Sequence, residues 1–126
     1  MKGILLIDHG STREEANRML ADMAAIVQRV VGGDVLVTYA HMELAAPTIA
    51  EGFAACVSGG ATEVIAFPYM LSPGKHSTRD IPRMVADAAR AHEGVGYRVT
   101  DPFGLDERLA EVVASRAGIE VQCTSR

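Results

Sequence analysis

The sequence has 126 residues, the size of one domain, and 48% of them are hydrophobic and 22% charged, which is the balance of a soluble globular protein. Its net charge of −4 and scattered basic residues exclude general nucleic-acid binding, which needs a basic stripe. No apolar run approaches the roughly 20 residues that cross a bilayer, and a histidine follows the apolar start instead of a cleavage site. We expect a cytoplasmic protein with no membrane segment, and with Cys56 as a reduced core thiol.

The first half of the chain has the pattern of two strand–helix units. Residues 3–7 (GILLI) are continuously apolar, as is typical of a strand buried on both faces. Thr12 and Glu15 then predict a capping box at the start of a helix, which a glycine pair ends. Residues 35–39 (VLVTY) predict a second strand, and Pro47 suits the first turn of a second helix.

The second half repeats this alternation. Residues 63–69 (EVIAFPY) predict a third strand, and a third helix follows a Ser-Pro-Gly loop. Residues 97–100 predict a short fourth strand. A fourth helix is indicated by the spacing of Leu105, Leu109, Val112 and Val113. The tail from Ile119 fits either a fifth strand or a frayed end.

Four β-then-α units predict a single doubly wound α/β domain over residues 1–126. Its parallel sheet has four strands, or five if the tail joins it, and helices cover both faces. With the strand order 2-1-3-4, the helices that leave the first and third strands diverge, and ligands of such folds bind in the crevice between them. We therefore expect the functional residues directly after these two strands.

Each of these two positions carries one histidine. Residues 8–11 include His9 after the first strand, and residues 71–76 end on His76 after the third. Imidazole is the commonest ligand of borderline divalent metals and the usual general base near neutral pH. Two imidazoles with open coordination positions would suit a metal that is held briefly and passed on. His41 and Glu43, just beyond the second strand, add a third imidazole and a carboxylate near the same edge.

Other residues of these loops narrow the choice of ligand. Gly10 and Gly74 allow a ligand to approach the backbone closely. Neither a P-loop nor a GxGxxG motif follows the first strand, which argues against nucleotide binding. Lys75, Arg79 and Arg13 can pair with substrate carboxylates, although solvated surface charge is the simpler interpretation for both arginines.

At these residues the sequence resembles the short form of the sirohydrochlorin chelatase family, small relatives of the cobalt- and iron-inserting enzymes of cobalamin and siroheme synthesis. The motifs occur in order and at family spacing through most of the first two thirds of the chain: His9-Gly10-Ser11 with Asn17, Tyr39-Ala40-His41-Met42-Glu43, Pro47-Thr48, Gly60-Ala61, Pro68-Tyr69-Met70-Leu71, Pro73-Gly74-Lys75-His76 and Asp80-Ile81-Pro82. Two positions depart from the family pattern. Thr12 stands where the family usually has arginine, and His41 where it usually has an aromatic or other apolar residue.

The resemblance implies the class II chelatase fold and a lyase that inserts a divalent metal into sirohydrochlorin, with cobalt favoured over nickel or iron and no organic cofactor. It implies that His9 and His76 bind the metal and that His9 also accepts a proton. Glu43 can steady the cation or take the second proton. The resemblance further implies that the tetrapyrrole contacts Glu43, Leu71, Ser72, Pro73, Gly74 and Lys75. Members of this length resemble half of a two-domain chelatase and work as homodimers, so we expect a homodimer here.

Two other functions are compatible with this sequence. A non-catalytic metal or tetrapyrrole carrier would use the same histidines, and a turnover assay separates it from a chelatase because a carrier releases no excess product. A flavodoxin-like regulatory or protein-interaction domain would have no metal role. The absence of bound divalent metal or tetrapyrrole would favour that last function.

Overall fold

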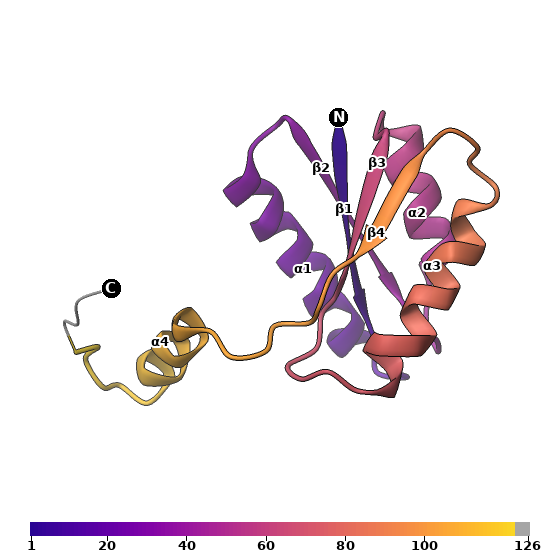
Figure 1. The fold of residues 1–126 in the computed structure, drawn as a ribbon. Helices are drawn as coiled ribbons and strands as arrows, with labels where there is room; N and C mark the ends of the chain where they lie inside the picture. Colours follow the sequence, from indigo (N-terminus) through magenta and orange to yellow (C-terminus); the bar gives the residue numbers. More distant parts are fainter. Residues whose placement is uncertain (123–126) are drawn as a thin grey trace.

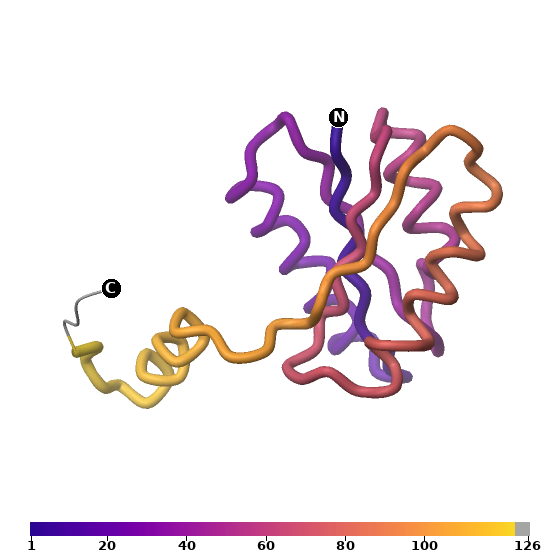
Figure 2. The backbone as a smooth tube through the Cα atoms, in the orientation of Figure 1, coloured from indigo at the N-terminus to yellow at the C-terminus, as the bar shows by residue number. Residues whose placement is uncertain are grey.

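The computed structural model describes residues 1–122 as a four-stranded parallel sheet with helices on both faces (Figures 1 and 2). The strand order is β2-β1-β3-β4, which confirms the predicted α/β class and strand order. The strands are β1 (Lys2–Asp8), β2 (Val35–His41), β3 (Glu63–Pro68) and β4 (Gly96–Val99). The helices are α1 (Glu14–Val31), α2 (Ile49–Ser58), the π-helical turn η1 (His76–Asp80), α3 (Ile81–Ala89) and α4 (Glu107–Arg116).

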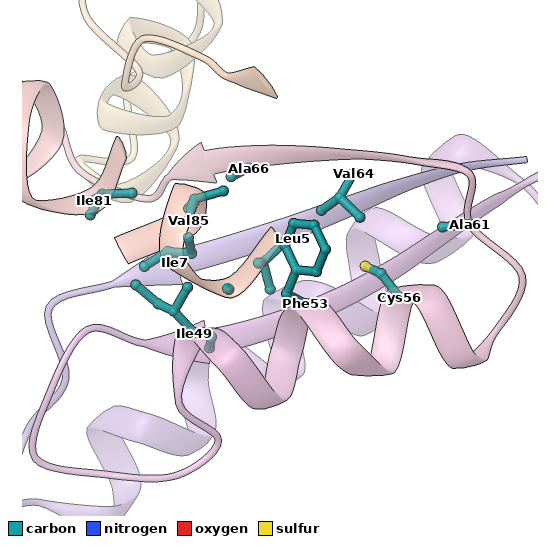
Figure 3. Packing of buried hydrophobic residues seen from close by; sticks show 12 residues of the cluster. Leu5, Ile7, Ile49, Phe53, Cys56, Ala61, Val64, Ala66, Ile81 and Val85 are labelled. Atoms are coloured by element: carbon teal, nitrogen blue, oxygen red, sulfur yellow. The ribbon is translucent and has the colours of Figure 1, made fainter. Parts of the chain in front are cut away.

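The central strand β1 is buried on both faces, which explains its continuous apolar run. Leu5 lies under α2 and α3 in the larger core cluster, where Phe53 is fully buried (Figure 3). Leu6 points to the other face and packs with Leu20 of α1. Cys56 of α2 is also fully buried, and this burial raises the pKa of its thiol. The prediction of a reduced core thiol at this position agrees with that environment.

The sequence predicted a capping box at the start of α1, but the structure has one at the start of α2. Thr12 does not cap α1, which begins at Glu14 with no side-chain cap. The capping box instead opens α2, where the Thr48 hydroxyl accepts from the Glu51 N–H and the Glu51 carboxylate accepts from the Thr48 N–H. Pro47 therefore precedes the cap of α2 and lies outside its first turn.

The last helix, α4, follows an extended connection from β4 and buries none of its residues (Figure 2). Leu105 precedes α4 and is fully exposed, as Val113 largely is. The tail from Ile119 fitted either a fifth strand or a frayed end. Residues 119–122 form no strand, and residues 123–126 lie outside the described part. None of the helices within residues 1–122 combines the length and apolarity needed to cross a membrane.

The two Thr-x-x-Glu sequences offer a matched stability test. Thr48→Ala removes the hydroxyl that caps α2 and should lower the free energy of unfolding by about 1 kcal/mol. Thr12→Ala, at an exposed position outside α1, should change it by less than about 0.5 kcal/mol. Urea denaturation measures both values. Equal losses in the two variants would contradict this assignment of the capping box.

Candidate active site

The two loop histidines meet at the carboxyl ends of β1 and β3. His9 directly follows β1, and His76 opens η1 after the loop that leaves β3. Their ring centroids lie 4.8 Å apart with an angle of 76° between the ring planes. Both side chains are about half exposed, at 48% and 46%. The expectation that these two imidazoles come together at the ends of β1 and β3 is therefore met, and both remain open to a cation from solvent.

Glu43 joins this pair from the loop after β2. Its carboxylate oxygen Oε1 lies 3.6 Å from Nε2 of His9, and its side chain is 54% exposed. Two backbone hydrogen bonds hold the loops together, since the N–H groups of Met42 and Glu43 donate to the carbonyls of Asp8 and His9. The structure thus brings His9, His76 and Glu43 to one edge of the sheet, as the sequence predicted.

Gly10 makes this close approach of the two loops possible. Its φ is +93°, in the left-handed region that favours glycine, and a Cβ at this position would collide with the carbonyl oxygen of Glu43. Glycine is therefore required here by the backbone conformation and by the lack of space.

The loop before His76 is exposed over its whole length. Its members are Leu71, Ser72, Pro73, Gly74 and Lys75. The carbonyl of Gly74 accepts hydrogen bonds from the N–H and the hydroxyl of Thr78 and from the hydroxyl of Ser77, which is buried. At its other end, Gly104 donates to the carbonyl of Leu71. These bonds leave the side chains between them free to meet a ligand.

Asp80 is a residue of this site that the sequence reasoning gave no role. Its Oδ2 lies 3.1 Å from Nδ1 of His76, and its Oδ1 accepts from Nε of Arg79 at 3.2 Å. The hydrogen bond from Arg79 holds the pKa of the Asp80 carboxyl below its usual value, and the His76 bond and the charge of Arg83 act in the same direction. The signal in the sequence was the spacing of four between His76 and Asp80, which places the two side chains on one side of a helical turn.

His41 lies deeper than the sequence suggested. It is the last residue of β2 instead of a loop residue, and it is 1% exposed. Its Nδ1 lies 2.6 Å from Oδ1 of Asp8, which stands opposite it in the sheet. Burial raises the pKa of the Tyr69 hydroxyl, and the charge of this Asp8 carboxylate acts in the same direction. His41 thus holds the end of β1 from the neighbouring strand β2, with its ring away from solvent.

The site supplies a pair of imidazoles and no larger ligand cluster. Among residues 1–122, no group of three or more histidine, cysteine, aspartate or glutamate side chains is arranged to hold a metal ion. A cation bound by the two imidazoles alone would keep its remaining coordination positions for water or for another ligand.

The CbiX family model matches residues 3–119, which is nearly the whole chain. The chain belongs to the CbiX family. This confirms the resemblance that the loop motifs indicated.

Known relatives agree with this assignment. The chain is 42% identical over 114 residues to the chloroplastic sirohydrochlorin ferrochelatase of Arabidopsis thaliana. This alignment covers 90% of the chain and 50% of the Arabidopsis protein. It is 29% identical over 126 residues to the sirohydrochlorin cobaltochelatase of Sulfurisphaera tokodaii, covering 100% of this chain and 99% of the relative.

A solved structure has the same fold. The sirohydrochlorin chelatase SirB from Bacillus subtilis subspecies spizizenii, in complex with cobalt, superposes with a TM-score of 0.84 at 31% identity. The match covers 93% of this CbiX chain and 50% of SirB. The chain thus spans about half the length of SirB and of the Arabidopsis relative.

The role of Gly10 can be tested by stability. Gly10→Ala places a Cβ against the Glu43 carbonyl and strains the backbone, so it should lower the free energy of unfolding by about 1–3 kcal/mol. Gly33→Ala is the matched control, because nothing lies within 4 Å of the added Cβ, and its effect should stay within about 0.5 kcal/mol. Chemical denaturation compares the two. A Gly10→Ala protein as stable as the Gly33→Ala protein would rule out this packing of the loops.

Proposed function

We propose that this CbiX protein is a chelatase that inserts a divalent metal ion into sirohydrochlorin. The observation that carries the proposal is the pair of imidazoles of His9 and His76, 4.8 Å apart at the carboxyl ends of β1 and β3. Relatives that match most of the chain are named sirohydrochlorin ferrochelatase and sirohydrochlorin cobaltochelatase, which supports the same reaction class.

Insertion replaces two pyrrole N–H protons of the macrocycle by one divalent cation, so the reaction needs a metal-binding group and a proton acceptor side by side. In the proposed mechanism His9 and His76 bind the cation while it loses its waters. When the cation passes to the macrocycle, the ring nitrogen of His9 that it leaves accepts one pyrrole proton, a task that imidazole performs well near neutral pH. Glu43, 3.6 Å from His9, takes the second proton, or it steadies the cation while solvent water takes that proton.

The exposed loop before His76 is the proposed contact for the macrocycle. Sirohydrochlorin carries acidic side chains, and the ammonium group of Lys75 can pair with one of them. The neighbouring Leu71, Ser72, Pro73 and Gly74 offer apolar and backbone surface at the same edge. Cobalt is the proposed metal, with nickel and iron as the alternatives. The metal is a substrate of this reaction and leaves with the product.

We further propose that the protein works as a homodimer in the cytoplasm. An apolar groove of about 670 Å³ lies between α1, the sheet and α4, with Phe67 and Phe103 among its lining residues. Exposed Val112 and Val113 on α4 add to this apolar surface. A second copy would cover that surface and enlarge the cleft for the macrocycle, a task for which relatives such as SirB have twice the chain length.

The histidine pair can be tested by cobalt insertion, followed through the absorbance of sirohydrochlorin. His9→Ala should reduce the rate to the uncatalysed background, because it removes a metal ligand and the proton acceptor together. His76→Ala should lose mainly metal affinity, so excess cobalt should partly restore its rate. His92→Ala removes an imidazole outside this site, one that stacks on Phe53, and should keep the wild-type rate.

Wild-type rates in both site variants would refute the assignment of the two histidines. A single turnover per protein, with no excess product released, would instead identify a carrier.

The dimer can be tested by sedimentation at micromolar concentration, where the wild type should have twice the chain mass of 13.4 kDa. Val113→Asp should raise the dissociation constant by at least about tenfold, because a carboxylate would be buried without a partner. Ser115→Asp, on the same helix, is the control for added charge. A fully active monomeric wild type would count against the dimer.

A further inference from the structure

We propose that Asp80 is a positioning residue that holds the imidazole of His76 in the tautomer and orientation needed to bind the cation. This inference rests on the proposed function, because it assumes that His76 is a metal ligand. It concerns how the ligand is prepared, and it can be tested on the metal-free protein.

The geometry of the His76–Asp80 pair suits this role. Nδ1 of His76 lies 3.1 Å from Oδ2 of Asp80, one helical turn away on η1. A carboxylate accepts a hydrogen bond, so this contact places the ring proton on Nδ1 and leaves the lone pair of Nε2 for a cation. The ring stands edge to face with His9. The free nitrogen of His76 is therefore available at the edge of the sheet where the other imidazole lies.

Asp80 is itself held in place, which a positioning group requires. Its side chain is only 13% exposed, whereas that of His76 is 46% exposed. Its two oxygens have separate partners, since Oδ2 faces His76 while Oδ1 accepts from Arg79 and lies 3.7 Å from Nη2 of Arg83. The arginines thus fix the carboxylate without competing for the oxygen that faces the imidazole. Metal-binding histidines commonly donate their second ring N–H to such a carboxylate.

The π-helical turn explains why the pair forms at this point. η1 continues directly into α3, and Asp80 makes no side-chain capping bond to that helix. The start of the turn is fixed by Ser77 and Thr78, whose hydroxyls donate to the carbonyl of Gly74. Wider turns of this kind are frequent at functional sites. The Asp80 carboxylate therefore makes no capping bond to α3, and its contacts are with His76, Arg79 and, at 3.7 Å, Arg83 of α3.

The first experiment measures the tautomer of His76 by ¹⁵N NMR in the metal-free protein above neutral pH. In the wild type the proton should reside on Nδ1. In Asp80→Ala the ring should shift towards the Nε2–H form, while Asp87→Asn should leave it unchanged. Asp87 is the matched control, because it lies on α3, is 59% exposed and pairs only with Arg90 among the described ion pairs of residues 1–122. A wild-type His76 with its proton on Nε2 would overturn the inference.

The second experiment titrates the same proteins with cobalt alone. Asp80→Asn and Asp80→Ala should weaken cobalt binding by about 10- to 100-fold, and Asp87→Asn should not. Saturating cobalt should restore most of the insertion rate, because His9 remains. Asp80→Asn keeps the shape of the side chain, so the cobalt titration can be done with this variant if Asp80→Ala fails to fold.

The two hypotheses fail in different ways. Cobalt binding that does not depend on His9 and His76 would refute the proposed function. The tautomer of His76 in the metal-free protein would still test independently whether Asp80 orients the imidazole. Cobalt binding that depends on His76 but is equally tight in both Asp80 variants would refute the role of Asp80 alone.

Discussion

The parallel pairing of β1 with β3 is the constraint on which the site depends. The register opposes Ile7 to Pro68, so the two strands end at the same edge of the sheet. Neighbouring strands lie roughly 4.8 Å apart, and an inserted strand would double that separation. His9 and His76 are 67 positions apart in the chain, yet their ring centroids are separated by 4.8 Å, about the width of one strand pairing. The adjacency of β1 and β3 in the order β2-β1-β3-β4 is therefore a requirement of the histidine pair as well as a feature of the fold.

Contacts within the loops then arrange the side chains at the edge of the sheet where β1 and β3 end. Gly10 lets the loop after β1 pass against the carbonyl of Glu43, and the turn η1 brings Asp80 against His76. These contacts orient side chains that stay about half exposed, whereas the hydrophobic core below them is closed. This division suits a site that must receive a hydrated cation and a large macrocycle: the sheet supplies rigidity, and the loops supply access.

The strands of the sheet could be predicted from the sequence because they are short, uniform apolar runs that turn residues and amphipathic helical stretches separate. The sequence did not predict the local structure correctly where the same pattern can lead to two different structures. Thr12 and Thr48 each stand three residues before a glutamate, and only Thr48 caps a helix, because tertiary context sets where α1 begins. His41 could be placed near the edge, but its burial beside Asp8 depends on where β2 ends. Asp80 was visible as a motif residue four positions after His76, although their contact requires a helical turn that begins at His76, and the sequence did not show where that turn starts.

Metal-edge crystallography tests most directly whether His9 and His76 bind one divalent cation together. Crystals of this CbiX protein grown with excess cobalt should give one strong anomalous peak at the crevice between β1 and β3. We expect a ring nitrogen of His9 and Nε2 of His76 each at about 2.1 Å from the peak. A fully occupied cobalt that contacts only one of the two imidazoles, or that lies elsewhere on the molecule, would contradict the claim.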